Sequence, residues 1–166
     1  MTEPPDLLPL DDAAHCLACP RLTAPDPPPR ERIVTTGRWS VAHAFNANLE
    51  GWLVVLPVRH VVAVDALDED EARELGPLLR AVSAALRAVV GCEKTYVLQL
   101  AESEGFNHVH FHVVPRRADL PDAYCGTKIF GLLGNASLDV VDAARMDELA
   151  LGVRGHLVAA GVAAPS

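Results

Sequence analysis

The sequence predicts an α+β domain with a central, mostly antiparallel sheet, one long helix between strands and a C-terminal helix. Short apolar runs rich in β-branched residues and bounded by glycine or proline predict the strands. An apolar stripe at three- and four-residue steps predicts the long helix. Along the chain these patterns come in the order strands, helix, strands, helix, which favours the α+β class.

The composition limits the class of protein. The chain has 166 residues, half of them apolar, and a net charge of −8, which suits one domain with a substantial core. It has no basic stripe, which argues against a surface for duplex nucleic acid. No apolar run approaches the roughly 20 residues of a membrane span, and the acidic, proline-rich start is no secretory signal. We therefore expect a cytoplasmic protein with no membrane and no duplex nucleic-acid partner.

The first half of the chain is expected to supply three strands. Residues 1–14 are predicted to be a flexible N-terminal lead-in, and the prolines at 27–29 make an extended connector. Strands are predicted at 33–36, 39–45 and 52–57, with a turn at 46–51 before the last of them.

The long helix has clear boundary signals. Asp68 is its predicted N-cap, Glu71 completes a capping box, and Gly91 ends it. Its apolar stripe consists of Leu75, Leu78, Leu79, Val82, Leu86 and Val89.

The remainder of the chain is expected to finish the sheet and add one helix. A strand is predicted at 95–100, and residues 116–137 are expected to be loop-like. Asp142 is expected to cap a last helix, whose buried side carries Met146, Leu149, Val153 and Leu157. We expect one domain over 15–137 and a C-terminal helical extension over 138–166.

Three histidines, His108, His110 and His112, alternate with apolar residues. Because successive side chains of a strand point to opposite faces, the three imidazoles are predicted to share one face. With seven histidines in the whole chain, so regular a row is hard to obtain by chance. Imidazole can be a nucleophile, a general acid or base, or a metal ligand near neutral pH, so we expect the chemistry on this face.

The four cysteines fall into two kinds. Cys16 and Cys19 form a Cys-x-x-Cys pair, which in a reducing compartment indicates metal or redox chemistry rather than a disulfide. Cys92 and Cys125 stand alone and are interpreted as packing residues. A tetrahedral zinc at the pair would need two more ligands, commonly histidine.

The segment His108-Val109-His110-Phe111-His112-Val113-Val114, followed by Pro115-Arg116, resembles the signature of the histidine triad (HIT) superfamily of nucleotide hydrolases and transferases. Upstream, the segment from Gly51 to His60 is similar to the family's strand that ends in proline, a basic residue and histidine. The resemblance covers roughly residues 15–135 and is closest to the zinc-containing, bacterial-type branch. It implies a HIT-like fold around a central antiparallel sheet, usually paired into a homodimer.

The resemblance also implies a reaction. The middle histidine, here His110, attacks the α-phosphorus of a nucleotide and forms a covalent nucleotidyl-imidazole, which water or another acceptor resolves. A backbone carbonyl that holds one ring nitrogen would leave the lone pair of the other nitrogen free for this attack. His112, one strand step away, is expected to bind a phosphate oxygen on which charge develops.

A metal site follows from the same resemblance. Superfamily members with an N-terminal Cys-x-x-Cys pair complete a zinc site with two histidines, so the implied ligands are Cys16, Cys19, His60 and His108. Such a site has no open position and would be structural, tying the N-terminal arm to the sheet. His15, next to Cys16, is the competing ligand, and no organic cofactor is expected.

Three further residues are expected at the substrate. Asn46 corresponds to the family position that binds ribose hydroxyls, and Gln99 to an amide that contacts the phosphates. Where the hydrolase branches place a hydroxyl residue before the triad, this chain has Glu104-Gly105, so Ser103 would have to supply that hydroxyl.

Two departures from the family pattern bear on activity. Trp52 stands where the family often has a histidine, and it could stack on a base or fill the core. Glu102 and Glu104 add negative charge near the expected phosphate site, which should disfavour long polyphosphate chains.

We therefore predict a histidine triad nucleotide hydrolase or nucleotidyl transferase, acting on a nucleoside phosphate derivative such as a phosphoramidate or a dinucleoside polyphosphate. Two alternatives stay open. The alternating histidines could bind the catalytic metal of a hydrolase, although no convincing carboxylate base lies in the triad strand. The chain could also be a nucleotide-binding module with little turnover.

Overall fold

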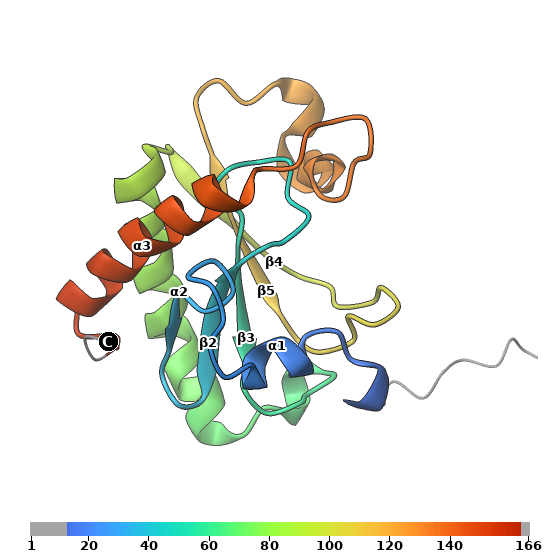
Figure 1. Ribbon diagram of the computed structural model, residues 1–166, viewed down its shortest axis with the longest axis vertical. Helices are drawn as coiled ribbons and strands as arrows, with labels where there is room; N and C mark the ends of the chain where they lie inside the picture. Colours follow the sequence, from blue (N-terminus) through green and yellow to red (C-terminus); the bar gives the residue numbers. More distant parts are fainter. Residues whose placement is uncertain (1–12, 164–166) are drawn as a thin grey trace, which may run out of the picture.

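The computed structural model describes residues 13–163, so the lead-in predicted over 1–14 lies, except for its last two residues, outside the described part. Five strands form one antiparallel sheet in the order β1-β2-β3-β5-β4 (Figure 1). The strands are β1 (Val34–Thr35), β2 (Trp39–His43), β3 (Leu53–Pro57), β4 (Lys94–Gln99) and β5 (Phe111–Arg116). The helices are α1 (Cys19–Thr23), α2 (Glu69–Val90) and α3 (Ala143–Ala159), with 3-10 helices η1 (Ala13–His15) and η2 (Val64–Ala66). The predicted α+β fold is confirmed.

Helix α2 begins and ends where the sequence predicts. The Asp68 carboxylate accepts from the backbone N–H groups of Asp70 and Glu71, and the Glu71 carboxylate accepts from the Asp68 N–H, which completes the capping box. Gly91 ends the helix at φ 69°, a left-handed conformation that glycine adopts without a Cβ clash. The side of the helix that faces the core buries Leu78, Val82, Ala85 and Leu86.

Helix α3 lies beside α2 on the same face of the sheet (Figure 1). Asp142 caps it by accepting from the Arg145 N–H, as predicted. Ala150, Val153 and Leu157 belong to the same apolar core as α2 and the sheet, so the segment expected as an extension packs into the domain. None of the helices described between residues 13 and 163 is long and apolar enough to cross a membrane.

The opposite face of the sheet carries a second, smaller apolar cluster, which includes Trp52, Val114 and Ile129. The 3-10 helix η4 (Gly126–Leu132) supplies Ile129 and Leu132 to it, and η3 (Asp122–Tyr124) precedes η4. The expectation of a loop over 116–137 is therefore wrong for these stretches. Glycines punctuate the segment, but burial of its apolar side chains orders it against the sheet.

Strand β5 begins at Phe111, which corrects the prediction that one strand carries all three histidines. Pro57, the last residue of β3, has no N–H to donate to a strand ladder, and the Val109 N–H bonds to the Val61 carbonyl at 2.7 Å. His112 therefore lies within the sheet, opposite Val54, whereas the other two histidines lie in the segment that leads into β5.

The variant Leu157→Ala tests whether α3 is part of the core. Leu157 is fully buried, so its truncation should lower the free energy of unfolding by about 2–5 kcal/mol, because it removes apolar contacts and leaves a cavity. Leu151→Ala makes the same change on the same helix at a side chain that is 52% exposed, and should stay within about 0.5 kcal/mol. Urea unfolding measures both, and equal losses would contradict the described packing of α3.

Candidate active site and metal centre

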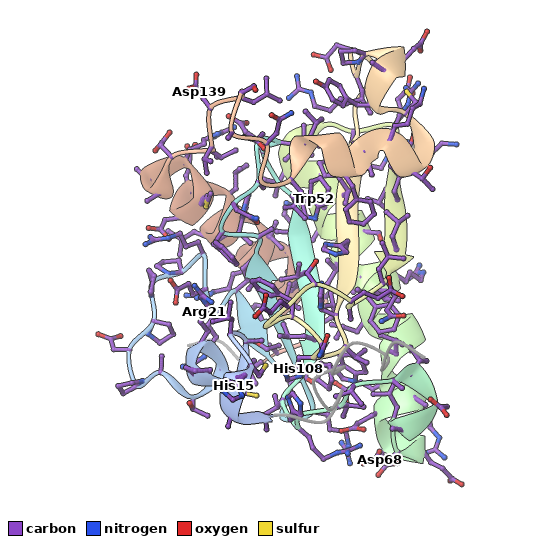
Figure 2. All side chains as sticks on the ribbon, turned by 90° about the vertical axis from the view of Figure 1, so that its right-hand side faces the viewer. His15, Arg21, Trp52, Asp68, His108 and Asp139 are labelled. Atoms are coloured by element: carbon purple, nitrogen blue, oxygen red, sulfur yellow. The ribbon has the colours of Figure 1, made fainter. Side chains whose placement is uncertain are left out.

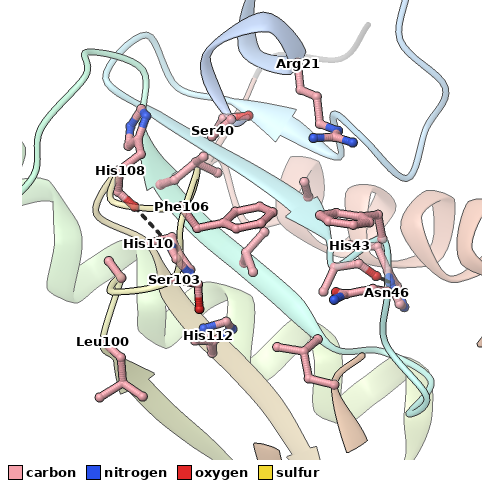
Figure 3. Close-up of a pocket in the computed structure, with 18 of the residues that line it drawn as sticks. Arg21, Ser40, His43, Asn46, Leu100, Ser103, Phe106, His108, His110 and His112 are labelled. Carbon is pink, nitrogen blue, oxygen red and sulfur yellow. Dashed lines mark hydrogen bonds between the residues drawn. The ribbon is translucent and has the colours of Figure 1, made fainter. Parts of the chain in front are cut away.

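A cavity of about 490 Å³ lies on the face of the sheet opposite α2 and α3 (Figure 3). It is lined by β2, β3, the triad segment, the loop before that segment, and α1. Its size is that of a small-molecule site. The lining residues that carry polar or ionisable groups are Arg21, Glu31, Ser40, His43, Asn46, Glu102, Ser103, His108, His110 and His112.

His110 is held by the backbone of its own segment. Its Nδ1 atom lies 2.8 Å from the carbonyl oxygen of His108, and a carbonyl only accepts, so Nδ1 carries the proton (Figure 3, dashed line). The other ring nitrogen, Nε2, therefore keeps its lone pair. Burial lowers the pKa of His110, which favours the neutral ring at pH 7. One fixed nitrogen and one bare nitrogen are the arrangement that a nucleophilic imidazole needs.

His112 has a different partner at the corresponding nitrogen. The indole N–H of Trp52 donates to His112 Nδ1 over 3.0 Å. Burial, with a smaller contribution from His110, lowers the pKa of His112 to about 3, so this ring is also neutral at pH 7. The rings of His110 and His112 meet edge to face, with centroids 4.7 Å apart. Trp52 is fully buried, so of its two predicted roles the structure supports core packing and not base stacking.

Four potential metal ligands meet at the end of the sheet beside α1, near the position of His108 in Figure 2. The ligand atoms of Cys16, Cys19, His60 and His108 all lie within 4.8 Å of one another. Two thiolates and two imidazoles are a donor set that zinc binds tetrahedrally. His15, the competing ligand, is exposed and stands outside this group.

The surroundings of the cluster also fit a metal. The Nε2 atom of His108 donates to the Pro57 carbonyl at 2.8 Å, which leaves the Nδ1 lone pair turned toward both sulfurs, 3.6 Å away. Burial, followed by the interaction with Cys16, raises the pKa of Cys19 to about 11. A coordinated cation reverses this effect, because a thiol that binds a metal is deprotonated.

Contacts on two sides hold the cluster in place. The Leu17 N–H, inside the Cys-x-x-Cys segment, donates to the Gly105 carbonyl at 2.9 Å, which joins this segment to the loop before the triad. Gly105 has φ +77°, and a Cβ there would lie 2.9 Å from the Leu17 side chain, so the loop needs glycine. Arg59, next to His60, forms a 2.7 Å ion pair with the buried Glu71 carboxylate of α2.

The structure separates the residues predicted to bind substrate. Asn46 and Ser103 line the cavity, as does Glu102, whereas Glu104 is not among the lining residues (Figure 3). Gln99 does not line it either. Gln99 of β4 pairs with Phe111 of β5, and Phe111 packs against the core on the other face of the sheet. Because paired residues share a face, this register directs Gln99 away from the histidines. The role expected for Gln99 is therefore not supported.

Several residues of the cavity escaped sequence reasoning. Phe45 and Phe106 stack with ring centroids 5.8 Å apart, and the guanidinium of Arg21 lies 4.6 Å from the Phe45 centroid. No alternation or regular spacing in the sequence indicates the two phenylalanines. For Arg21 the available signal is its position two residues after Cys19, next to the Cys-x-x-Cys pair. His43 also lines the cavity, but its Nδ1 donates to the Ala44 carbonyl and its Nε2 accepts from a backbone N–H, so it is a structural, neutral ring.

The arrangement is that of a histidine triad protein: an α+β fold with an antiparallel sheet, alternating histidines at a cavity, and a cluster of two cysteines and two histidines. A comparison with protein families matches the HIT domain over residues 28–119, which is more than half of the chain. The chain belongs to the HIT family. Among curated proteins, none matches it.

Solved structures share the fold. A hypothetical histidine triad nucleotide-binding protein from Sulfolobus tokodaii has a TM-score of 0.65 at 18% identity, covering 86% of this chain and 91% of its own. A Zn-bound histidine triad family protein from Mycobacterium smegmatis has a TM-score of 0.61 at 17% identity, covering 87% and 96%. The Plasmodium falciparum diadenosine triphosphate hydrolase has a TM-score of 0.58 at 15% identity, covering 77% and 76%. These likenesses show the common fold and do not distinguish a branch of the family.

Proposed function

We propose that this protein is a nucleotide hydrolase or nucleotidyl transferase whose His110 attacks the α-phosphorus of a nucleoside phosphate derivative. The observation that carries the proposal is the bond from His110 Nδ1 to the His108 carbonyl, which leaves a bare Nε2 on a ring that lines the cavity. Membership of the HIT family supports it, as do two structural neighbours, one named a nucleotide-binding protein and one a diadenosine triphosphate hydrolase.

The chemistry has two steps. In the first, His110 Nε2 forms a bond to the α-phosphorus while the bond from phosphorus to the leaving group breaks, and the leaving group departs with the electron pair. In the resulting nucleotidyl-imidazole the proton stays on Nδ1, which continues to donate its hydrogen bond to the His108 carbonyl. In the second step, water or another acceptor attacks phosphorus, the bond from phosphorus to Nε2 breaks and returns its electron pair to the ring, and the acceptor releases its proton to solvent. His112 stands beside His110, where it can stabilise charge on a phosphate oxygen.

The cavity offers groups for the rest of a nucleotide. Asn46 and Ser103 are the proposed polar contacts to the sugar and the leaving group, respectively. Arg21 is the one arginine or lysine among the described lining residues and could pair with a phosphate oxygen. Glu102 opposes additional negative charge, which favours substrates with few phosphates, such as a phosphoramidate or a short dinucleoside polyphosphate.

The alternative of a hydrolase whose metal is held by the alternating histidines has less support from the geometry. That site needs the three rings to converge on one point. Instead, His108 turns its Nδ1 to the cysteines, His110 Nδ1 is bonded to a carbonyl, and His112 Nδ1 accepts from an indole. The other alternative, a binding module with little turnover, would bind nucleoside monophosphates tightly and form no product.

We further propose that the cluster of Cys16, Cys19, His60 and His108 holds a structural zinc ion. Its four donors leave no open position for substrate, so the ion would act by tying the N-terminal segment to the triad segment. The proposal includes no organic cofactor. The Zn-bound neighbour from Mycobacterium smegmatis supports the choice of metal.

Two properties of the whole protein belong to the same proposal. A cytoplasmic location is supported by four free cysteines, since thiols persist in a reducing compartment. A homodimer is supported by the resemblance to the family and by exposed apolar side chains at Val97 and Leu100, on and next to the edge strand β4.

The variant His110→Ala tests the nucleophile. With a panel of nucleoside phosphoramidates and dinucleoside polyphosphates, it should fold normally and lose at least roughly 10³-fold in turnover, as when other covalent nucleophiles are removed. Intact-mass analysis of rapidly quenched wild type should show an added nucleoside monophosphate that this variant lacks.

The matched control is His156→Ala, which removes an exposed histidine of α3 and should keep both turnover and adduct. Turnover by His110→Ala at the wild-type rate would refute the proposal. So would tight binding of nucleoside monophosphates by a wild type that turns over no member of the panel.

The variant Cys16→Ala tests the metal centre. It should lose the bound zinc ion found in the wild type and should melt at a lower temperature, because the N-terminal segment loses its tie to the sheet. Elemental analysis of the dialysed protein and a thermal melt measure the two effects. Cys125→Ser, which changes a half-buried cysteine outside the cluster, should change neither. Zinc retained by Cys16→Ala would contradict the ligand set.

A further inference from the structure

The hydrogen bond between Trp52 and His112 determines which nitrogen of His112 carries a proton. An indole N–H is a donor and never an acceptor, so His112 Nδ1, 3.0 Å away, must offer a lone pair. In a neutral imidazole the proton then lies on Nε2. His110 has the opposite arrangement, with its proton on Nδ1 and its lone pair on Nε2. The two neighbouring rings are therefore complementary tautomers, one a nucleophile and the other a donor.

The packing around Trp52 keeps this bond in place. Trp52 is fully buried and meets the His112 ring edge to face at 5.7 Å between centroids. Phe130 of η4 closes the arrangement, with its centroid 5.7 Å from Trp52 and 5.1 Å from His112. The indole cannot turn away without displacing this cluster, so the donor stays directed at Nδ1.

A tryptophan in this position has an uncommon effect. A functional histidine usually donates a hydrogen bond from one ring N–H to a carboxylate or carbonyl. This bond makes the other ring nitrogen, the one that faces the site, more basic. At His112 the arrangement is the opposite: Trp52 donates to Nδ1, so Nε2 carries the proton and is a hydrogen-bond donor. It also opposes the imidazolium form, because a second proton on Nδ1 would face the indole N–H across 3.0 Å.

We propose, first, that Trp52 is a positioning residue that holds His112 as a neutral hydrogen-bond donor with its proton on Nε2. We propose, second, that the site thereby favours leaving groups that depart as phosphate oxyanions over leaving groups that depart as amines. The first part stands on the hydrogen bonds alone. The second part rests on the proposed function.

The preference follows from where the proton must go. When the phosphorus–oxygen bond breaks, a phosphate leaving group takes the electron pair as an anion, and a neutral N–H donor stabilises it without transferring a proton. When a phosphorus–nitrogen bond breaks, the departing amine must also gain a proton. His112 held neutral has no readily released proton to give, so that proton must come from water.

The tautomer can be measured without any substrate. In wild-type protein, two-dimensional ¹⁵N NMR should give His112 a protonated, pyrrole-type Nε2 and an unprotonated, pyridine-type Nδ1. Trp52→Phe removes the donor and retains an aromatic side chain, so the two nitrogen signals of His112 should move toward each other as the tautomers mix. A wild-type His112 with its proton on Nδ1 overturns the proposal, and this result holds even if the variant does not fold.

The matched control is Trp39→Phe. Trp39 is equally buried, and its indole N–H donates to the Glu71 carbonyl, away from the cavity. Trp39→Phe should lower the stability of the protein about as much as Trp52→Phe does, and it should leave the His112 signals unchanged. Equal changes at His112 in both variants would reduce Trp52 to a packing residue and overturn the proposal.

Activity supplies a second readout, with two substrates that share one nucleoside monophosphate and differ only in a phosphate or an amine leaving group. Wild type should prefer the phosphate. Trp52→Phe should lower kcat for that substrate by roughly 10- to 100-fold with little change in KM, and should reduce the preference, while Trp39→Phe keeps it. A preference unchanged in Trp52→Phe overturns the second part. Absence of turnover with both substrates counts against the proposed function, and the NMR result still decides the tautomer.

Discussion

The site depends on how His108 is held. Its Nε2 donates to the Pro57 carbonyl, its Nδ1 faces the two cysteines, and its own carbonyl accepts the proton of His110. One residue therefore belongs both to the cluster of potential metal ligands and to the orientation of the proposed nucleophile. Any change that shifts this backbone alters which nitrogen of His110 is bare, and through it the chemistry available in the cavity.

The rest of the fold serves to keep that backbone fixed. The carboxylate of Glu71, which caps α2, also pairs with Arg59. Because Arg59 precedes His60, this ion pair fixes the segment that carries His60 against the start of α2. From the other side, Gly105 accepts from Leu17 and joins the loop before the triad to the Cys-x-x-Cys segment. A helix terminus, a loop and the N-terminal segment thus meet at the end of the sheet. We therefore expect loss of the proposed zinc ion to lower the stability of the protein.

Local rules in the sequence predicted much of this, and three-dimensional context accounts for the remainder. The boundaries of α2 follow from Asp68 and Gly91, because caps are chemical signals read over a few residues. The face of Gln99 and the partner of His112 depend on strand register and on packing between distant segments, which periodicity does not encode. The same holds for η3 and η4, whose order comes from burial against the sheet.

The most direct test is a crystal structure of the zinc-loaded protein with a bound nucleoside monophosphate. We predict that the α-phosphate faces His110 Nε2, that His110 Nδ1 stays hydrogen-bonded to the His108 carbonyl, and that the His108 ring binds the metal with both cysteines. A His110 ring that coordinates the metal, or a nucleotide whose phosphate lies away from it, would contradict the account.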